Sequence, residues 1–205
     1  MSAHPRAYDF RNLRAPEGFH NINEIADLST QSWLHPVQSL YGDWNGRHLV
    51  MGQDLNAWGN LAQRDAESLR HNPNFLTNKH LERIFGKEFD AIYANLSWFI
   101  KGGETASAPI NFTREVMAAN QPVLKATITA MPNLQTVYCL GAKVFTALTR
   151  KKYGPLTKCQ AVFFDRAVEI FALPHPGGLG MANFQKQTGL SREAALNKIQ
   201  DFVCG

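Results

Sequence analysis

Short apolar runs alternate with longer amphipathic stretches along most of the chain. Four of the apolar runs have the length and composition of buried strands, at residues 49–51, 90–96, 136–140 and 168–173. Apolar runs of this kind are typical of strands that are covered on both faces of a sheet. A fifth run, at residues 160–164, can pair with the last of these strands through a turn at Asp165-Arg166.

Helix-period patterns occupy residues 77–85, 113–130, 144–149 and 191–203. Thr77 and Ser191 are suitable N-caps, and Gly86 suits the position just after a helix end. Pro122 is expected to kink or split the second helix, whose predicted core face consists of Val116, Val123, Leu124, Thr127 and Ile128. Strands that alternate with helices predict an α/β fold, in which a mostly parallel sheet carries helices on both faces.

A single domain is expected from the length of 205 residues. Residues 1–46 are polar and irregular, and we expect them to form an N-terminal arm with one or two short helices. The α/β core is then expected to comprise residues 47–205. The chain shows no internal repeat and no low-complexity segment that would divide it further.

Composition and charge narrow the class of protein. A hydrophobic content of 44% with 19% charged residues is typical of a folded globular chain. No apolar run approaches the length of a membrane helix, and residues 1–23 lack the apolar segment of a secretory signal. Cys139, Cys159 and Cys204 are widely separated, so we expect reduced thiols in a cytoplasmic monomer. The net charge of +4 permits a polyanionic partner without requiring one.

Polar residues or glycine follow each predicted core strand directly. Asp54, Asn95, Gly141 and His175 come at or just past the four strand ends. In parallel sheets ligands bind beyond the carboxyl ends of the strands, so these residues are expected to share one rim. A carboxylate and an imidazole on one rim are suited to stabilising the charges that develop in a reaction.

These strand-end residues resemble the motifs of the uracil-DNA glycosylase superfamily. Gly52-Gln53-Asp54 resembles the start of its first motif, GQDPY, and the His-Pro-Gly-Gly-Leu segment at residues 175–179 resembles its second motif, HPSPL. Asn95 stands where the family has a base-reading Asn, and residues 140–142 resemble its strand-Gly-helix junction. The order of these features matches from about residue 47 onward. The resemblance implies a three-layer α/β/α fold with a central, mostly parallel four-stranded sheet.

The resemblance also implies a function and roles for individual residues. The expected activity is that of a monofunctional DNA glycosylase that needs no metal or cofactor and removes uracil or a related deaminated base from single- or double-stranded DNA. Asp54 would orient water and offset positive charge on the sugar, and His175 would donate a hydrogen bond to the O2 atom of the base. The base-binding residues would be Gly52, Gln53, Asn95, Trp58 and Phe75. The DNA-binding residues would be Pro176, Gly177, Gly178, Leu179 and Lys143.

The chain departs from the family pattern at both motifs. Leu55-Asn56 replaces the Pro-Tyr whose Tyr excludes thymine, and Gly177-Gly178 replaces the Ser-Pro that grips a phosphate. Each candidate residue also has a structural alternative. Asp54 and Asn95 could cap turns, His175 could bond a backbone carbonyl, and Leu179 could be a rim leucine. Trp58, Phe75 and the basic residues Lys143, Arg150, Lys151, Lys152 and Lys158 could be ordinary core or surface residues.

Two further functions remain open at the level of sequence. The replaced motif residues are compatible with a relative that binds DNA or a base but has lost glycosylase activity. The lack of an aromatic residue aligned for base stacking leaves room for an unrelated α/β enzyme that acts on free nucleosides. DNA binding with no turnover would favour the former, and product release from free nucleosides the latter.

Overall fold

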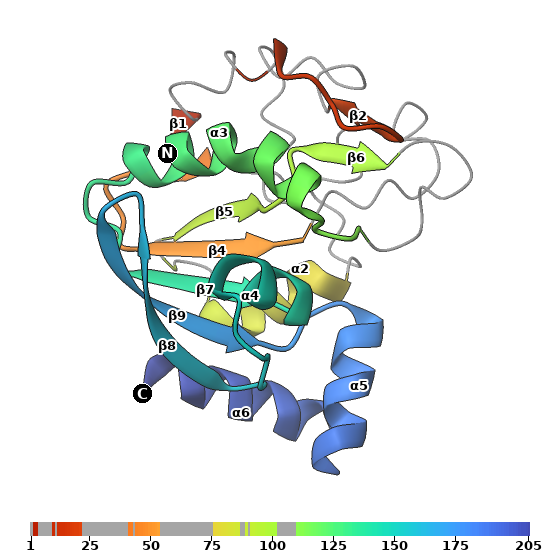
Figure 1. The fold of residues 1–205 in the computed structure, drawn as a ribbon. Helices are drawn as coiled ribbons and strands as arrows, with labels where there is room; N and C mark the ends of the chain where they lie inside the picture. Colours follow the sequence, from red (N-terminus) through yellow and green to blue (C-terminus); the bar gives the residue numbers. More distant parts are fainter. Residues whose placement is uncertain are drawn as a thin grey trace.

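Seven strands form one mixed sheet in the computed structural model of this protein (Figure 1). The structure describes residues 2–3, 10, 12–21, 41–42, 44–53, 76–86, 89, 91–101 and 110–205. The sheet order is β1 (Ser2–Ala3), β3 (Tyr41–Gly42), β5 (Ala91–Asn95), β4 (His48–Gly52), β7 (Thr136–Leu140), β9 (Arg166–Leu173) and β8 (Thr157–Phe163). β2 (Phe19–Asn21) and β6 (Phe99–Lys101) form a separate antiparallel pair.

The four strands predicted to form the core lie together at the centre of the sheet. β5, β4, β7 and β9 run parallel to one another, whereas β3 and β8 flank them in antiparallel orientation. The expectation of a four-stranded sheet is therefore not confirmed, because the sheet is larger and mixed. Residues expected to form an irregular arm contribute two of the additional strands, β1 and β3, and also β2.

Helices cover both faces of the sheet. α3 (Arg114–Ala130) and α4 (Ala142–Thr149) pack on one face, and α2 (Leu76–Phe85), α5 (Gly178–Thr188) and α6 (Arg192–Cys204) pack on the other (Figure 1). This arrangement gives three layers, as the alternation of strands and helices predicted. The N-cap expected at Ser191 is present, since its side chain accepts a hydrogen bond from the N–H of Ala194, and Thr113 caps α3 in the same way. The N-cap predicted at Thr77 is wrong, because α2 begins at Leu76 and Thr77 lies inside it.

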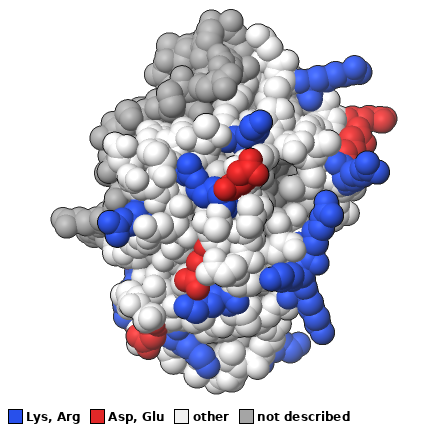
Figure 2. All heavy atoms as spheres, turned by 60° about the vertical axis from the view of Figure 1, so that its left-hand side comes forward, with Lys and Arg blue, Asp and Glu red and all other residues white. Residues whose placement is uncertain are grey.

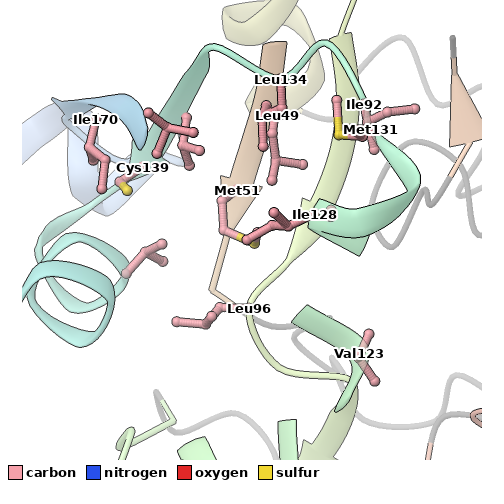
Figure 3. Close-up of a cluster of buried hydrophobic side chains, with 14 of the residues drawn as sticks. Leu49, Met51, Ile92, Leu96, Val123, Ile128, Met131, Leu134, Cys139 and Ile170 are labelled. Carbon is pink, nitrogen blue, oxygen red and sulfur yellow. The ribbon is translucent and has the colours of Figure 1, made fainter. Parts of the chain in front are cut away.

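The two helical layers are separated by strands that are buried on both faces. Leu49 and Met51 of β4 face α3 and α4, while Val50 between them packs with α2, α5 and α6. Figure 3 shows the first of these clusters, where Ile128 of α3 lies beside Met51. Because successive side chains of a strand point to opposite faces, a wholly apolar strand needs a helical layer on each side. The apolar sequence of β4 is explained by this position.

Several predicted boundaries are wrong by a few residues. β8 begins at Thr157, and the turn to β9 is formed by Phe164 and Asp165, one residue before the predicted turn. Both turn residues have positive φ angles, of 49° and 67°, as two-residue hairpin turns matching the sheet twist require. Pro122 lies inside α3, which continues without a break through it.

The largest error of prediction is α5. No helix was predicted between the last core strand and residue 191, but α5 begins at Gly178. Two glycines in the first turn hide the helix from sequence reasoning, because glycine has a low intrinsic helix propensity. For Gly180 the reason for a glycine is its close packing against the backbone and Cβ of His175.

Candidate functional site

The carboxyl ends of β5, β4, β7 and β9 meet at one edge of the sheet, as predicted. Gly52 is in register with Asn95, and Leu140 is in register with Leu173, two residues before His175. The four strand ends span three inter-strand spacings, roughly 14 Å in all. Gly52, Gln53, Asn95 and His175 therefore lie along the same edge. Asp54, Trp58 and Phe75 fall outside the described residues.

Gly52 and Asn95 fit closely together at this edge. A β-carbon at position 52 would lie 2.2 Å from Oδ1 of Asn95, so the amide side chain of Asn95 occupies the space that a side chain on residue 52 would need. The backbone pairing continues beyond the strands, because the N–H groups of Leu96 and Ser97 donate to the carbonyls of Gly52 and Gln53. The chain is thus held beside β5 up to the residue that precedes Asp54.

Gly141 permits the close approach of His175 to the end of β7. Its N–H donates to the carbonyl of Leu173 at 2.8 Å, and a β-carbon at position 141 would lie 3.3 Å from Cβ of His175. Gly141 also has a φ angle of 97°, a conformation that disfavours other residues. The hydroxyl of Tyr153 donates to the same Leu173 carbonyl at 3.1 Å. The backbone leading into His175 is therefore fixed from two directions.

The imidazole of His175 is held in one protonation state by its own turn. The N–H of Gly177 donates to Nδ1 of His175 at 3.0 Å. Nδ1 can accept this bond only while it carries no proton, so the ring proton of the neutral form is on Nε2. Burial also lowers the pKa of His175 below its ordinary value. His175 is therefore a neutral ring with Nε2–H as its donor, rather than a cation.

The residues after His175 form the N-terminus of α5. Pro176 is buried, Gly177 is the N-cap without a capping side chain, and Leu179 is 79% exposed. The first N–H groups of a helix have no partners within the helix and attract anions. Gly178 and Leu179 are the first two residues of the helix, so their backbone N–H groups could bind an anion close to His175.

Lys143 lies in the first turn of α4 and makes internal contacts. Its ammonium donates to the carbonyl of Ile110 at 2.7 Å and to Oδ1 of Asn111 at 3.3 Å, so it tethers the segment that leads into α3. Lys158 is also engaged, since it pairs with Glu169 and lies over the ring of Phe171. Arg150, Lys151 and Lys152 are exposed as well. Figure 2 shows basic side chains gathered along one side of the molecule with few acidic ones among them.

A pocket of about 440 Å³ lies at the opposite edge of the sheet. It is lined by Arg47, Pro132, Asn133, Leu134, Gln135 and Arg166, which precede or begin β4, β7 and β9. Its Arg166 donates to the carbonyls of Ile128 and Met131 at the end of α3, which gives that guanidinium a structural role. This pocket is therefore separate from the candidate site at the carboxyl edge.

Two contacts from α2 complete the surroundings of His175, and sequence reasoning did not anticipate them. Thr77 and His80 lie one helical turn apart, and both face the turn at residues 175–177. Nothing in the sequence marks them as neighbours of this turn, because that contact depends on how α2 packs against a segment almost 100 residues away.

Comparisons with known proteins leave the family undetermined. The chain matches no protein-family model, and no curated protein matches it. No helix in the described part of the chain is long and apolar enough to span a membrane. Among the same residues, no three His, Cys, Asp or Glu side chains gather as a set of metal ligands.

Proposed function

We propose that this protein is a DNA glycosylase of the uracil type. It would hydrolyse the N-glycosidic bond of uracil or a related deaminated base in DNA and leave an abasic site. The observation that carries the proposal is the state of His175, a neutral Nε2–H donor held at the same sheet edge as Asn95 and the Gly52-Gln53 segment. The motif resemblance at these positions supports it.

The chemistry of base removal makes use of this arrangement. As the bond between C1′ and the base stretches, the sugar becomes positively charged and the base becomes an anion. An Nε2–H group on His175 donates a hydrogen bond to the O2 atom of the base and stabilises the anion without transferring a proton. Asp54, which follows the fixed Gln53, offsets the charge on the sugar and orients the water that adds to C1′. The added water releases a proton to solvent, and the departing base anion takes one up from solvent.

Recognition of the base and of the strand falls to the neighbouring residues. The Asn95 amide offers one donor and one acceptor, which suits the O4 and N3–H groups of uracil. The N-terminus of α5, at Gly178 and Leu179, is suited to a phosphate beside the extruded nucleotide. The exposed Leu179 side chain would fill the gap that the base leaves in the duplex. The four parallel central strands would then correspond to the four-stranded sheet of the uracil-DNA glycosylase superfamily.

Incubation with uracil-containing oligonucleotides under single-turnover conditions, followed by alkali, tests the proposal. The wild-type protein is expected to give strand breaks at uracil in single- or double-stranded substrates. Asp54→Asn is expected to slow cleavage by about 10²–10⁴-fold while leaving DNA binding in place. Hypoxanthine and xanthine substrates extend the test to other deaminated bases. DNA binding without cleavage of any of these substrates would overturn the catalytic claim and leave a binding module.

A further inference from the structure

His80 is a buried titratable residue with a bond to the turn that holds His175. It lies on α2, only 4% of its surface is exposed, and its Nδ1 is 2.6 Å from the carbonyl oxygen of Pro176. A carbonyl can only accept, so Nδ1 of His80 carries the proton and donates it. This bond links α2 to the one residue between His175 and Gly177.

Both α2 and the first turn of α5 pack closely against this turn. A β-carbon at Gly177 would lie 3.4 Å from Oγ1 of Thr77 and 3.0 Å from Nδ1 of His175. A β-carbon at Gly180 would lie 2.3 Å from the backbone oxygen of His175. The His80 bond adds a polar contact between α2 and the turn.

We propose that His80 is a positioning residue, which holds the Pro176 carbonyl so that the Gly177 N–H stays aimed at Nδ1 of His175. The two bonds act on neighbouring atoms, because the Pro176 carbonyl and the Gly177 N–H belong to the same planar peptide group. Fixing one end of that peptide fixes the direction of the other. His80 in this way determines that the donor of His175 is Nε2–H. The importance of that donor for catalysis rests on the proposed function, but its alignment by His80 does not.

The matched variants are His80→Asn and His80→Leu. The Asn amide places an N–H donor near the position of Nδ1, whereas Leu fills the space without a donor. The measurement is the ¹⁵N resonance pattern of the His175 ring in the full-length protein, which distinguishes the two tautomers and is assigned with His175→Gln. Wild type and His80→Asn are expected to show Nδ1 as an acceptor only. His80→Leu is expected to shift toward a mixture of the two tautomers.

A second measurement needs no variant and covers the case in which His80→Leu does not fold. In the wild-type protein the Nδ1–H of His80 is expected to give a resonance that exchanges slowly with water, because it is buried and bonded. A folded His80→Leu protein with an unchanged His175 pattern would overturn the proposal. So would a wild-type His80 that carries its proton on Nε2 alone.

Activity provides a readout that separates this proposal from the proposed function. If the protein is a glycosylase, the single-turnover rate of His80→Leu is expected to fall by up to about 10²-fold, with recovery in His80→Asn. If His80→Leu alters the His175 tautomer but the wild-type protein has no glycosylase activity, the positioning role of His80 is supported and the proposed glycosylase function is contradicted. If the protein is an active glycosylase but its His175 resonances do not change in His80→Leu, the proposed function is supported and the positioning role of His80 is contradicted.

Discussion

At the scale of single residues, the state of His175 determines how the protein should respond to pH. Burial lowers the pKa of His175 below the ordinary value of 6.5, and protonation of Nδ1 would also set two donors against each other at Gly177. The rate of base removal is therefore expected to stay level as pH falls past 6.5 and to decline only when the ring takes up a proton. A pH–rate profile under single-turnover conditions measures this.

The same shift has a consequence for stability. Below pH 6.5 the unfolded chain binds a proton at residue 175 while the folded chain does not, so the free energy of unfolding falls until the lowered pKa is reached. Above pH 6.5 the ring is neutral in both states and contributes no pH dependence. Denaturant unfolding of wild type and His175→Gln at about pH 7.5 and about pH 5.5 tests this. A stability difference between the two proteins that is equal at both pH values would contradict it.

The residues at the sheet edge differ in how far the sequence predicts them. Gly52, Asn95 and His175 were placed at this edge correctly because each lies at or just past the end of an apolar run that is visible in the sequence. His80 was missed because a histidine on a helix has no signal for which neighbour it faces. The role of Gly177 was also missed, since the bond from its backbone to the ring of His175 depends on the local turn and not on residue type.

At the scale of elements, α5 shows how packing can override propensity. Glycine in the first turn of a helix is unfavourable by about 1 kcal/mol relative to alanine. Gly180 nevertheless suits its position, because a β-carbon there would lie 2.3 Å from the backbone oxygen of His175 and 2.8 Å from its Cβ. The sequence shows only the low helix propensity of glycine. The start of this helix could not be predicted without knowing that the backbone of His175 packs against it.

Gly180→Ala is therefore expected to destabilise the protein in spite of the better helix propensity of alanine. Moving a backbone carbonyl to admit a methyl group costs about 1–3 kcal/mol, which outweighs the gain of about 1 kcal/mol from propensity. Asn183→Ala is the matched control, because residue 183 lies on the exposed side of the same helix. That variant is expected to be neutral or slightly stabilising. Urea unfolding compares the two, and equal effects would contradict the close packing at Gly180.

At the scale of the whole molecule, the sequence predicts the layers better than the extent of the sheet. The parallel centre and the helices on both faces follow from apolar strands that alternate with amphipathic helices. β1 and β3 could not be predicted, because two-residue strands are too short to show a period. β3 pairs with the edge of β5 and β1 pairs with β3, so the position of each depends on the assembled sheet.

Charge is the other property that belongs to the whole molecule, and it predicts how DNA binding should depend on salt. Lys151 and Lys152 are exposed and directly precede Tyr153, whose hydroxyl reaches the Leu173 carbonyl at the candidate site. Each lysine that neutralises a phosphate contributes about 0.9 to the slope of log K against log salt for duplex DNA. Replacing both by Gln is therefore expected to reduce the slope by up to about 1.8. The Asp54→Asn background is used because cleavage there is expected to be about 10²–10⁴-fold slower.

The matched control replaces Lys186 and Lys198 by Gln, at exposed positions of α5 and α6. Both double variants lower the net charge from +4 by the same two units, so a difference between them reports position rather than total charge. Lys186 is in the last turn of α5, away from the helix N-terminus at the site. Fluorescence anisotropy over a series of salt concentrations measures the slopes. Equal slopes in the two variants would mean that DNA is attracted by the net charge alone, and that the basic residues after α4 do not contact it.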